Sequence, residues 1–284
     1  MIFRSRVPSG ALKDFVHDYW LYEDYTPSFH FKERILPSGT IELVINLQDD
    51  ELRIYDAART DSCKRFSGAL VSGTYGGSFV TDTAEERAVM GVHFKPAGAF
   101  PFLGVPADEL ADTHVDLEML WGQSARDLRE RLCEAPTPVK RFQILEDMLF
   151  AHLFRPLEHH HAVATTLVEF GRPGTHPMVR EIAKEIGLSQ RRFIRVFAAE
   201  VGLTPKLFGR IRRFQKAVSL ASASNTVPDW PRLALTCGYF DQSHLIGDFV
   251  EFSGLTPSEY FRQLRHLDQH KVRRKRNHVP LVRP

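Results

Sequence analysis

Basic and amide side chains cluster near residue 190, and both types can read the edges of DNA bases. Arg donates two parallel hydrogen bonds to O6 and N7 of guanine, and Gln pairs with adenine. Gln190, Arg191 and Arg195 are therefore suited to base recognition. A second group of basic side chains is expected to meet phosphates or solvent: Arg192, Lys206, Arg210 and Arg213.

The charge of the chain is divided unevenly along its length. Residues 1–155 contain 17 Lys and Arg against 24 Asp and Glu, a net charge of −7, whereas residues 156–284 contain 20 against 11, a net charge of +9. A basic half is suited to binding a polyanion. The same positive charge would be found on a half that is merely exposed to solvent, or on one that binds the acidic half. Sequence motifs are therefore needed to choose between these alternatives.

The elements that would position these side chains are predicted from apolar spacing. One helical stripe is formed by Val179, Ile182, Ala183 and Ile186, and Gly187 follows where a left-handed cap is expected. Ser189 is a good N-cap for a second helix. The apolar residues of that helix that face the core are Phe193, Val196 and Phe197. A small residue at the crossing lets two helices approach closely, as a helix-turn-helix requires.

An internal repeat with an offset of 52 residues supports this assignment. Gly-Leu-Thr-Pro at 202–205 follows Phe197 by five residues, and the same motif at 254–257 follows Phe249 by five. Thr before Pro places an N-cap ahead of an N1 proline, so each copy starts a new helix. One stripe predicts a long helix between the copies: Leu207, Ile211, Phe214, Val218 and Ala221.

These motifs resemble the DNA-binding domain of the AraC/XylS regulators. The first copy matches at Ile182-Ala183, Gly187-Leu188-Ser189, Arg192-Phe193, Arg195-Val196-Phe197 and Gly202-Leu203-Thr204-Pro205. The second copy matches at Gly238-Tyr239-Phe240-Asp241-Gln242-Ser243-His244-Leu245, Phe249 and Gly254-Leu255-Thr256-Pro257. The resemblance covers about residues 160–266. It implies seven helices that set two recognition helices into successive major-groove segments on one face of double-stranded DNA.

The resemblance also implies which side chains meet DNA. The groove-facing positions are Gln190, Arg191, Ile194 and Arg195 in the first unit and Gln242, Ser243, His244 and Gly247 in the second. Further candidates for contact with DNA, from the residue types, are Ser189, Arg192 and Arg213. Gly247 is a departure, because the family usually has Arg or Lys there. His244 is either a groove contact or a partly buried capping residue, and the sequence does not separate these readings.

Residues 1–155 are expected to fold as a small β-barrel or sandwich with helices, which makes the whole chain α+β. Leu12 to Tyr19 suggest an early helix, and alternation from Ile41 to Leu47 predicts a half-buried strand. The run Ala88 to Phe94 predicts a central strand. Two helices are expected to follow, over residues 117–132 and 142–149, and either pack on the barrel or dimerise.

Three segments of this half resemble the N-terminal domain of a poorly characterised subset of the same regulators: Leu36-Pro37-Ser38-Gly39 to Asn46-Leu47, Gly91 to Pro96, and Gly98 to Gly104. The resemblance implies a sensor role, since such domains commonly bind an effector or a partner. The partners implied are DNA, a small-molecule effector, a second copy of the chain and, for an activator, RNA polymerase.

Several side chains of the first half are candidates for a pocket. Trp20, Tyr22, Tyr25 and Phe29 either line an aromatic pocket or belong to an ordinary core. Glu42 and His93 are either polar pocket groups or satisfied barrel residues. The run His159-His160-His161 suggests an exposed hinge more than a metal site, because three consecutive side chains cannot converge from a helix.

The remaining observations narrow the class of protein. No run of about 18 uncharged apolar residues is present, so we expect no membrane partner and a cytoplasmic, nucleoid-associated protein. No catalytic motif, cofactor motif or metal-ligand spacing appears. An enzyme such as a DNA-repair methyltransferase fused to the same DNA-binding domain is the alternative, and it would need a reactive cysteine at Cys63 or Cys133. The third cysteine, Cys237, lies far from both, so free thiols are expected.

The expected organisation has three parts. Residues 1–155 form a sensor or dimerisation domain, residues 160–266 form the DNA-binding domain, and residues 267–284 form a basic tail. The tail contains the run Lys271 to Arg276, which is typical of a disordered segment with optional phosphate contacts.

Overall fold

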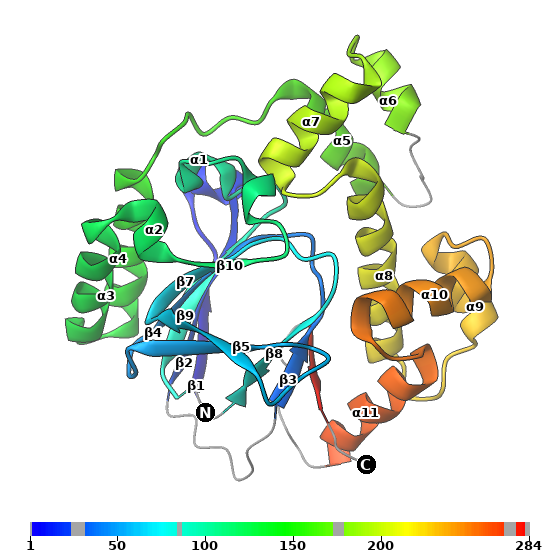
Figure 1. Ribbon diagram of the computed structural model, residues 1–284, viewed down its shortest axis with the longest axis horizontal. Coiled ribbons are helices and arrows are strands. Elements are labelled where there is room, and N and C mark those ends of the chain that lie inside the picture. The colour runs from blue at the N-terminus through cyan, green and yellow to red at the C-terminus, as the bar shows by residue number, and fades with distance from the viewer. Residues whose placement is uncertain (1, 24–31, 84–86, 173–178, 270–276, 282–284) are drawn as a thin grey trace.

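The computed structural model describes residues 2–23, 32–83, 87–172, 179–269 and 277–281. Two antiparallel sheets occupy the N-terminal part, and helices cover them from opposite sides (Figure 1). Helices α2 (Leu117–Trp121), α3 (Gln123–Glu134) and α4 (Pro138–Ala151) lie on one side, and the C-terminal helices lie on the other. The α+β class is confirmed. The two sheets form a sandwich, and no closed barrel is formed by the described residues.

The first sheet has six strands. Their order across the sheet is β1 (Ile2–Arg6), β2 (Val16–Glu23), β9 (Val89–Phe94), β4 (Glu42–Asn46), β7 (Ala69–Ser72) and β10 (His114–Asp116). The strands expected around residues 41–47 and 88–94 are therefore both present as β4 and β9. They pair with each other, and β9 lies in the interior of the sheet as predicted.

The second sheet has five strands, and one of them comes from the far end of the chain. Their order is β11 (His278–Pro280), β3 (Lys32–Ile35), β8 (Phe79–Asp82), β5 (Glu51–Tyr55) and β6 (Cys63–Ser67). Strand β11 pairs antiparallel with β3, and Val279 is buried. A chain segment beyond the last C-terminal helix thus completes an N-terminal sheet, although the sequence suggested only a basic tail there.

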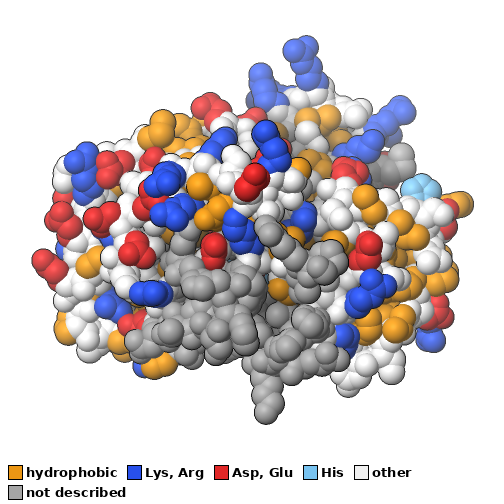
Figure 2. Space-filling view, turned by 60° about the horizontal axis from the view of Figure 1, so that its bottom comes forward, with side chains coloured by type: hydrophobic (Ala, Val, Ile, Leu, Met, Phe, Trp, Pro, Cys, Tyr) orange, Lys and Arg blue, Asp and Glu red, His pale blue; other side chains and the backbone are white. Residues whose placement is uncertain are grey.

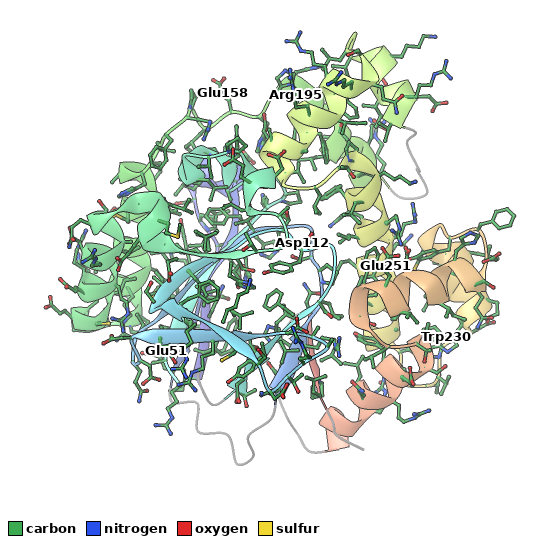
Figure 3. The ribbon with its side chains drawn as sticks, viewed as in Figure 1. Glu51, Asp112, Glu158, Arg195, Trp230 and Glu251 are labelled. Carbon is green, nitrogen blue, oxygen red and sulfur yellow. The ribbon has the colours of Figure 1, made fainter. Side chains whose placement is uncertain are left out.

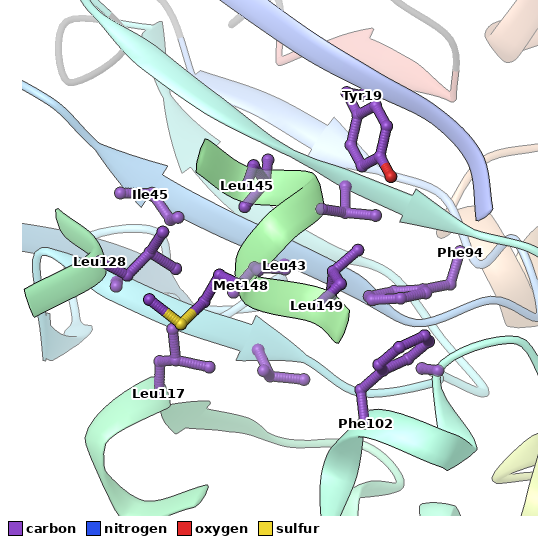
Figure 4. Close-up of a cluster of buried hydrophobic side chains, with 14 of the residues drawn as sticks. Tyr19, Leu43, Ile45, Phe94, Phe102, Leu117, Leu128, Leu145, Met148 and Leu149 are labelled. Carbon is purple, nitrogen blue, oxygen red and sulfur yellow. The ribbon is translucent and has the colours of Figure 1, made fainter. Parts of the chain in front are cut away.

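The six-stranded sheet is covered on both faces because its residues alternate in direction. Tyr19, Leu43 and Ile45 point toward the helices, where they meet Leu145 and Leu149 of α4 (Figure 4). Their neighbours along the same strands point toward the second sheet. The helix-facing side is the main N-terminal core, and the other side is left to line a cavity between the sheets.

Two of the predicted helices need correction. Residues 12–19 are not one helix: a short 3-10 turn, η1 (Gly10–Asp14), leads directly into strand β2. Tyr19 and its neighbours are held as a strand because β1 and β9 pair with both edges of β2, which outweighs the helical spacing. The helix expected over residues 117–132 is divided into α2 and α3 at Gly122, whose φ is +58°.

The C-terminal helices follow the predicted arrangement. Seven helices succeed one another: α5 (His161–Gly171), α6 (Val179–Glu185), α7 (Gln190–Val201), α8 (Pro205–Ala223), α9 (Trp230–Cys237), α10 (Gln242–Ser253) and α11 (Pro257–Gln269). The predicted stripe of α8 is buried except for the partly buried Leu207. Helix α8 is thus the long connector between two helix pairs. The first pair, or first unit, is α6 and α7, and the second pair, or second unit, is α9 and α10.

The helical region packs directly on the sandwich. Leu36 and Ala97 of the N-terminal half belong to the hydrophobic core of the helical region. The side-chain amide of Gln215 on α8 donates a 2.6 Å hydrogen bond to the backbone carbonyl of Pro37. Helix α7 packs against the 3-10 turn η3 (Ala107–Leu110), and α11 packs against β11. The two halves therefore support each other, so experiments on function should use the full chain.

Candidate functional site

The first helix pair is built by local signals that the sequence carries. Gly187 adopts φ +73° between α6 and α7, a conformation that glycine adopts without strain. The next residue turns back, and the backbone N–H of Leu188 donates to the carbonyl of Ala183 at 2.9 Å. The hydroxyl of Ser189 then caps α7 by accepting from the N–H of Arg192. The turn and the cap together fix the angle at which α7 leaves α6.

Helix α7 presents a polar outer face. Phe193 and Phe197 are fully buried against the rest of the domain. Ser189, Gln190, Arg191, Arg192 and Arg195 are exposed, and Ile194 is half-buried. Arg195 lies on the outer end of the helical region (Figure 3). On the right of Figure 2, where the C-terminal helices lie, Lys and Arg side chains project along the upper edge, whereas acidic and basic groups are mixed on the left.

The second helix pair repeats this construction. Gly238 takes φ +85° after α9, and the N–H of Tyr239 donates to the carbonyl of Ala234 at 3.0 Å. Asp241 caps α10 by accepting from the N–H of His244 at 2.9 Å. His244 Nδ1 also lies 2.9 Å from the Asp241 carboxylate, while two thirds of the His244 side chain is exposed. His244 therefore both faces outward and supports the cap.

The outer face of α10 carries less charge than that of α7. Ser243, His244 and Gly247 are exposed, and Gln242 is half-buried. A Cβ added at Gly247 would meet no heavy atom of the described residues within 4 Å. This position is open on the helix surface, so its glycine is not explained by packing.

Two arginines of α8 are directed at the second pair. Arg210 Nη2 lies 2.6 Å from Asp248 Oδ1 and 2.5 Å from Glu251 Oε2, and Figure 3 marks Glu251 on α10. The hydrogen bond to Glu251 is the largest effect that raises the pKa of Arg210. The expectation that Arg210 meets phosphates or solvent is therefore wrong. Arg213 is half-buried with its guanidinium 5.5 Å from the centre of the Tyr239 ring.

A cavity of about 330 Å³ lies between the two sheets. Its wall contains a row of polar side chains that crosses five neighbouring strands in register: Asp18, His93, Glu42, Ser72 and His114. Side chains directly opposite on paired strands are close enough to interact. The strand register therefore brings together residues that are up to 96 positions apart in sequence, from Asp18 to His114.

His93 is held between two carboxylates in this row. Its Nδ1 lies 2.9 Å from Asp18 Oδ1, and its Nε2 lies 2.8 Å from Glu42 Oε1. Burial is the largest single influence and would lower the pKa of His93, but Glu42 and Asp18 together outweigh it and raise the pKa to about 10. His93 is therefore an imidazolium at neutral pH, with one N–H directed at each carboxylate.

His114 at the other end of the row has the opposite character. Burial lowers its pKa to about 3, with a smaller contribution from Lys64, so the ring is neutral. Its Nδ1 is hydrogen-bonded to the hydroxyl of Tyr75. His114 Nε2 and Trp20 Nε1 are both buried, and neither has a hydrogen-bond partner among the described residues. Two polar atoms of the cavity wall are thus left unsatisfied.

The pocket reading of the sequence was partly right. Trp20, Tyr22, Glu42 and His93 do line the cavity. Tyr25 and Phe29 lie outside the described residues. Sequence reasoning missed Asp18, His114 and His278. Alternation along β2 would have placed Asp18 with Trp20, but no local signal joins His278 to a sheet that begins at residue 32.

The histidine run near the linker has structural contacts. The His159 ring lies 4.6 Å from the ring of Phe15, and the backbone N–H of His160 donates to Glu200 at 3.0 Å. His160 Nδ1 accepts from the N–H of Ala162 and caps α5. No group of three or more His, Cys, Asp and Glu side chains that would suit a metal ion occurs within the described ranges.

The three cysteines are free thiols in different surroundings. Cys63 is half-buried, Cys133 is exposed, and Cys237 is buried, which raises its pKa to about 11. The Cys133 thiol donates to the carbonyl of Leu47. A reactive thiol is expected to have a lowered pKa, whereas the pKa of Cys237 is raised. Across the part of the chain that the structure describes, no helix is long and apolar enough to cross a bilayer.

Comparisons with known proteins agree with the two helix pairs. A family described as "Helix-turn-helix domain" matches residues 182–263, and one described as "Domain of unknown function (DUF6597)" matches residues 4–116. No curated protein is significantly similar to the chain.

Three solved structures illustrate the range of similarity. Apo ToxT from Vibrio cholerae is 11% identical, with 87% of this chain and 97% of that one covered and a TM-score of 0.46. ToxT bound to an unsaturated fatty acid is 9% identical, with 91% and 94% covered and a TM-score of 0.44. A probable AraC family transcriptional regulator from Rhodopseudomonas palustris is 24% identical, with 37% and 98% covered and a TM-score of 0.33.

Proposed function

We propose that this chain, whose C-terminal helices form an AraC-type helix-turn-helix domain, is a sequence-specific regulator of transcription that binds double-stranded DNA. The observation that supports sequence recognition most strongly is the exposed face of α7. It carries Gln190, Arg191 and Arg195 on a helix whose opposite face is fully buried. These side chains can form paired hydrogen bonds with base edges in the major groove.

The two units contribute different kinds of contact in this proposal. The first unit reads bases through Gln190, Arg191, Ile194 and Arg195, while Ser189 and Arg192 at the start of α7 lie near phosphates. The second unit offers Gln242, Ser243 and His244 but no cation at Gly247, so it contributes more to positioning than to sequence reading. Arg213 supports the second unit through Tyr239 and reaches DNA only if its side chain turns outward.

The test uses the full chain and fragments of the host genome. The protein should bind a few fragments in the presence of excess unrelated DNA, and Arg195→Ala should reduce this selectivity while keeping general binding to DNA. Arg131→Ala is the matched control, because Arg131 is an exposed arginine on α3, far from the helix pairs. Equal retention of all fragments by the parent protein would refute sequence-specific regulation.

The N-terminal sandwich is proposed as the part that senses an effector. Its cavity of about 330 Å³ falls within the ~300–1,000 Å³ typical of small-molecule sites, and its wall has apolar surfaces with a few polar groups. A ligand bound there should raise the Tm of the full chain and change its affinity for DNA. A broad metabolite panel that alters neither property would count against the sensor role.

Two further partners belong to the proposal. Met119 on α2 and Val139 and Phe150 on α4 are exposed apolar side chains, which supports a homodimer through these helices. Analytical ultracentrifugation of the full chain tests this, and a monomer at working concentration would contradict it.

Contact with RNA polymerase is expected if the regulator activates transcription. Such a protein acts in the cytoplasm, on the nucleoid.

A further inference from the structure

The cavity between the sheets has a definite electrostatic character. Three carboxylates border it: Asp18, Glu42 and Asp82. The His93 imidazolium lies between Asp18 and Glu42 and balances only one of their two charges, while the half-exposed His17 ring lies 2.9 Å from the same Asp18 oxygen. Arg53 also borders the cavity, but its Nε donates to Glu51 Oε1 at 2.5 Å. The wall on the β2–β9–β4 side therefore has an excess of negative charge.

His93 cannot serve an anionic ligand in this arrangement. An imidazolium has two N–H groups, and those of His93 are directed at Asp18 and Glu42. A ligand carboxylate would find no N–H of His93 available, and it would lie beside two carboxylates in a partly buried site. Like charges held close together in such a site are strongly unfavourable. The cavity therefore disfavours anions.

Aromatic rings complete the site. Phe3, Trp20, Tyr22 and Phe79 line the cavity, and aromatic faces attract cations. Trp20 lies flat enough against the sheet that a Cβ at Gly91 would come within 2.6 Å of its ring, so only glycine leaves room for the indole.

We propose that the cavity binds a small organic cation, an amine or amidine on an aromatic body, with its charge beside Asp18 and Glu42 and its ring against Trp20 and Tyr22. This rests on the sensor role proposed above and specifies its ligand. The uncommitted oxygens of the two carboxylates accept the ligand's N–H groups, and the aromatic wall covers its apolar part.

His278 of β11 borders the same cavity, and its Nδ1 lies 2.6 Å from the buried Glu33 carboxylate of β3. Strand β11 follows α11 in the chain and packs against it. A ligand that presses on this wall therefore acts on a segment tied directly to the last helix of the DNA-binding domain. This connection gives an independent expectation, namely that cation binding changes affinity for DNA.

The experiment compares matched pairs of probes that share a ring and differ in charge. Phenethylamine and tryptamine are tested against phenylacetate and indole-3-acetate, using the Tm of the full chain and isothermal titration calorimetry. The amines should raise the Tm by about 5 °C or more at ~100 times Kd, and the carboxylates should leave it unchanged. Binding of the carboxylates alone, or no binding by any probe up to ~10 mM, overturns the proposal.

Variants locate the charge contact. Asp18→Asn and Glu42→Gln should each weaken amine binding by about tenfold or more. Glu118→Gln is the matched control, since Glu118 is a carboxylate that pairs with Arg126, and neither residue lines the cavity. Amine affinity that survives both cavity variants contradicts the proposed site. If a variant fails to fold, the comparison of matched probes on the parent protein decides alone.

Binding of the parent protein to genomic DNA without any probe is measured in parallel. If the parent protein binds DNA selectively but does not bind the amines, the proposed regulator function is kept and only the proposed organic-cation ligand is rejected. Loss of DNA selectivity in the parent protein removes the regulator assignment, whatever the amines do.

Discussion

Arg210 on α8 and Asp248 on α10 form an ion pair, with Nη2 and Oδ1 2.6 Å apart. Asp248 is 6% exposed, and Arg210 also reaches Glu251 at 2.5 Å. The connecting helix thus holds the second recognition helix through a charged, partly buried contact. Because α8 also packs on the first unit, this contact sets the angle between the two recognition helices.

Removing this contact should loosen the second unit. Arg210→Ala leaves the Asp248 carboxylate buried without its main partner, so we expect a loss of about 1–3 kcal/mol in the free energy of unfolding, measured by urea titration. Affinity for DNA should fall as well. Lys206→Ala, on the exposed side of the same helix, is the control for stability. Its free energy of unfolding should stay within about 0.5 kcal/mol of that of the parent protein. A stability equal to that of the control would show that the ion pair does not hold α10.

DNA binding by the full chain should depend strongly on salt. If about 6 phosphates are neutralised, a plot of log K against log salt concentration should have a slope near −5. The measurement is fluorescence anisotropy with one labelled fragment between about 50 and 200 mM salt. A slope near zero would mean that the basic half does not meet the DNA backbone.

The helix pairs were predictable from sequence because their signals are local. Ser189 and Thr204 cap helices within three residues of themselves, and the Gly-Leu-Thr-Pro repeat marks both units. The cavity was not predictable in the same way. Its row of polar residues exists only once the register of five strands is known, and its wall includes His278 from the opposite end of the chain.

Strand β2 shows why spacing alone misled. Leu12, Phe15, Val16 and Tyr19 are all buried, so the expectation of buried positions was correct. The same positions suit a turn followed by a strand, and the choice between these structures is made by β1 and β9. Residue 89, where β9 begins, is too distant in sequence for a local pattern to reveal that pairing.

The stability of the chain should have a maximum near pH 6.5. His93 has its pKa raised from 6.5 to about 10, so its contribution is fully present below pH 6.5 and is lost as the pH rises through about 10. His114 has its pKa lowered from 6.5 to about 3, so the unfolded chain binds more protons between these values and stability falls as the pH drops.

Two variants separate these effects in a series of Tm measurements across pH. His93→Gln should flatten the alkaline side of the profile, because Asp18 and Glu42 lose the cation between them. His114→Asn should flatten the acid side, where burial and Lys64 disfavour the charged ring. His17→Gln is the control, since His17 is half exposed beside Asp18. If Tm falls with rising pH in His93→Gln as steeply as in the parent protein, His93 is not held between Asp18 and Glu42.

The open position on α10 gives a prediction of increased affinity. Gly247→Ala should stabilise α10 by ~1 kcal/mol, because the added Cβ meets no neighbour and alanine favours the helix. Gly247→Arg should in addition tighten DNA binding, since an added cation on the exposed face of α10 can meet a phosphate or a base. Comparing the two variants in urea titration and in DNA titration separates helix stability from contact. Equal DNA affinity in both would place residue 247 away from the DNA.

Selection of bound sequences from a random DNA pool with the full chain shows whether two unequal recognition helices read one stretch of DNA. We expect two short elements whose centres lie about 10–10.5 base pairs apart, one of them more stringent than the other. Arg195→Ala should relax one position of the stringent element at a cost of about 1–3 kcal/mol. Selection of no common sequence, or a stringent element that Arg195→Ala leaves unchanged, would contradict this expectation.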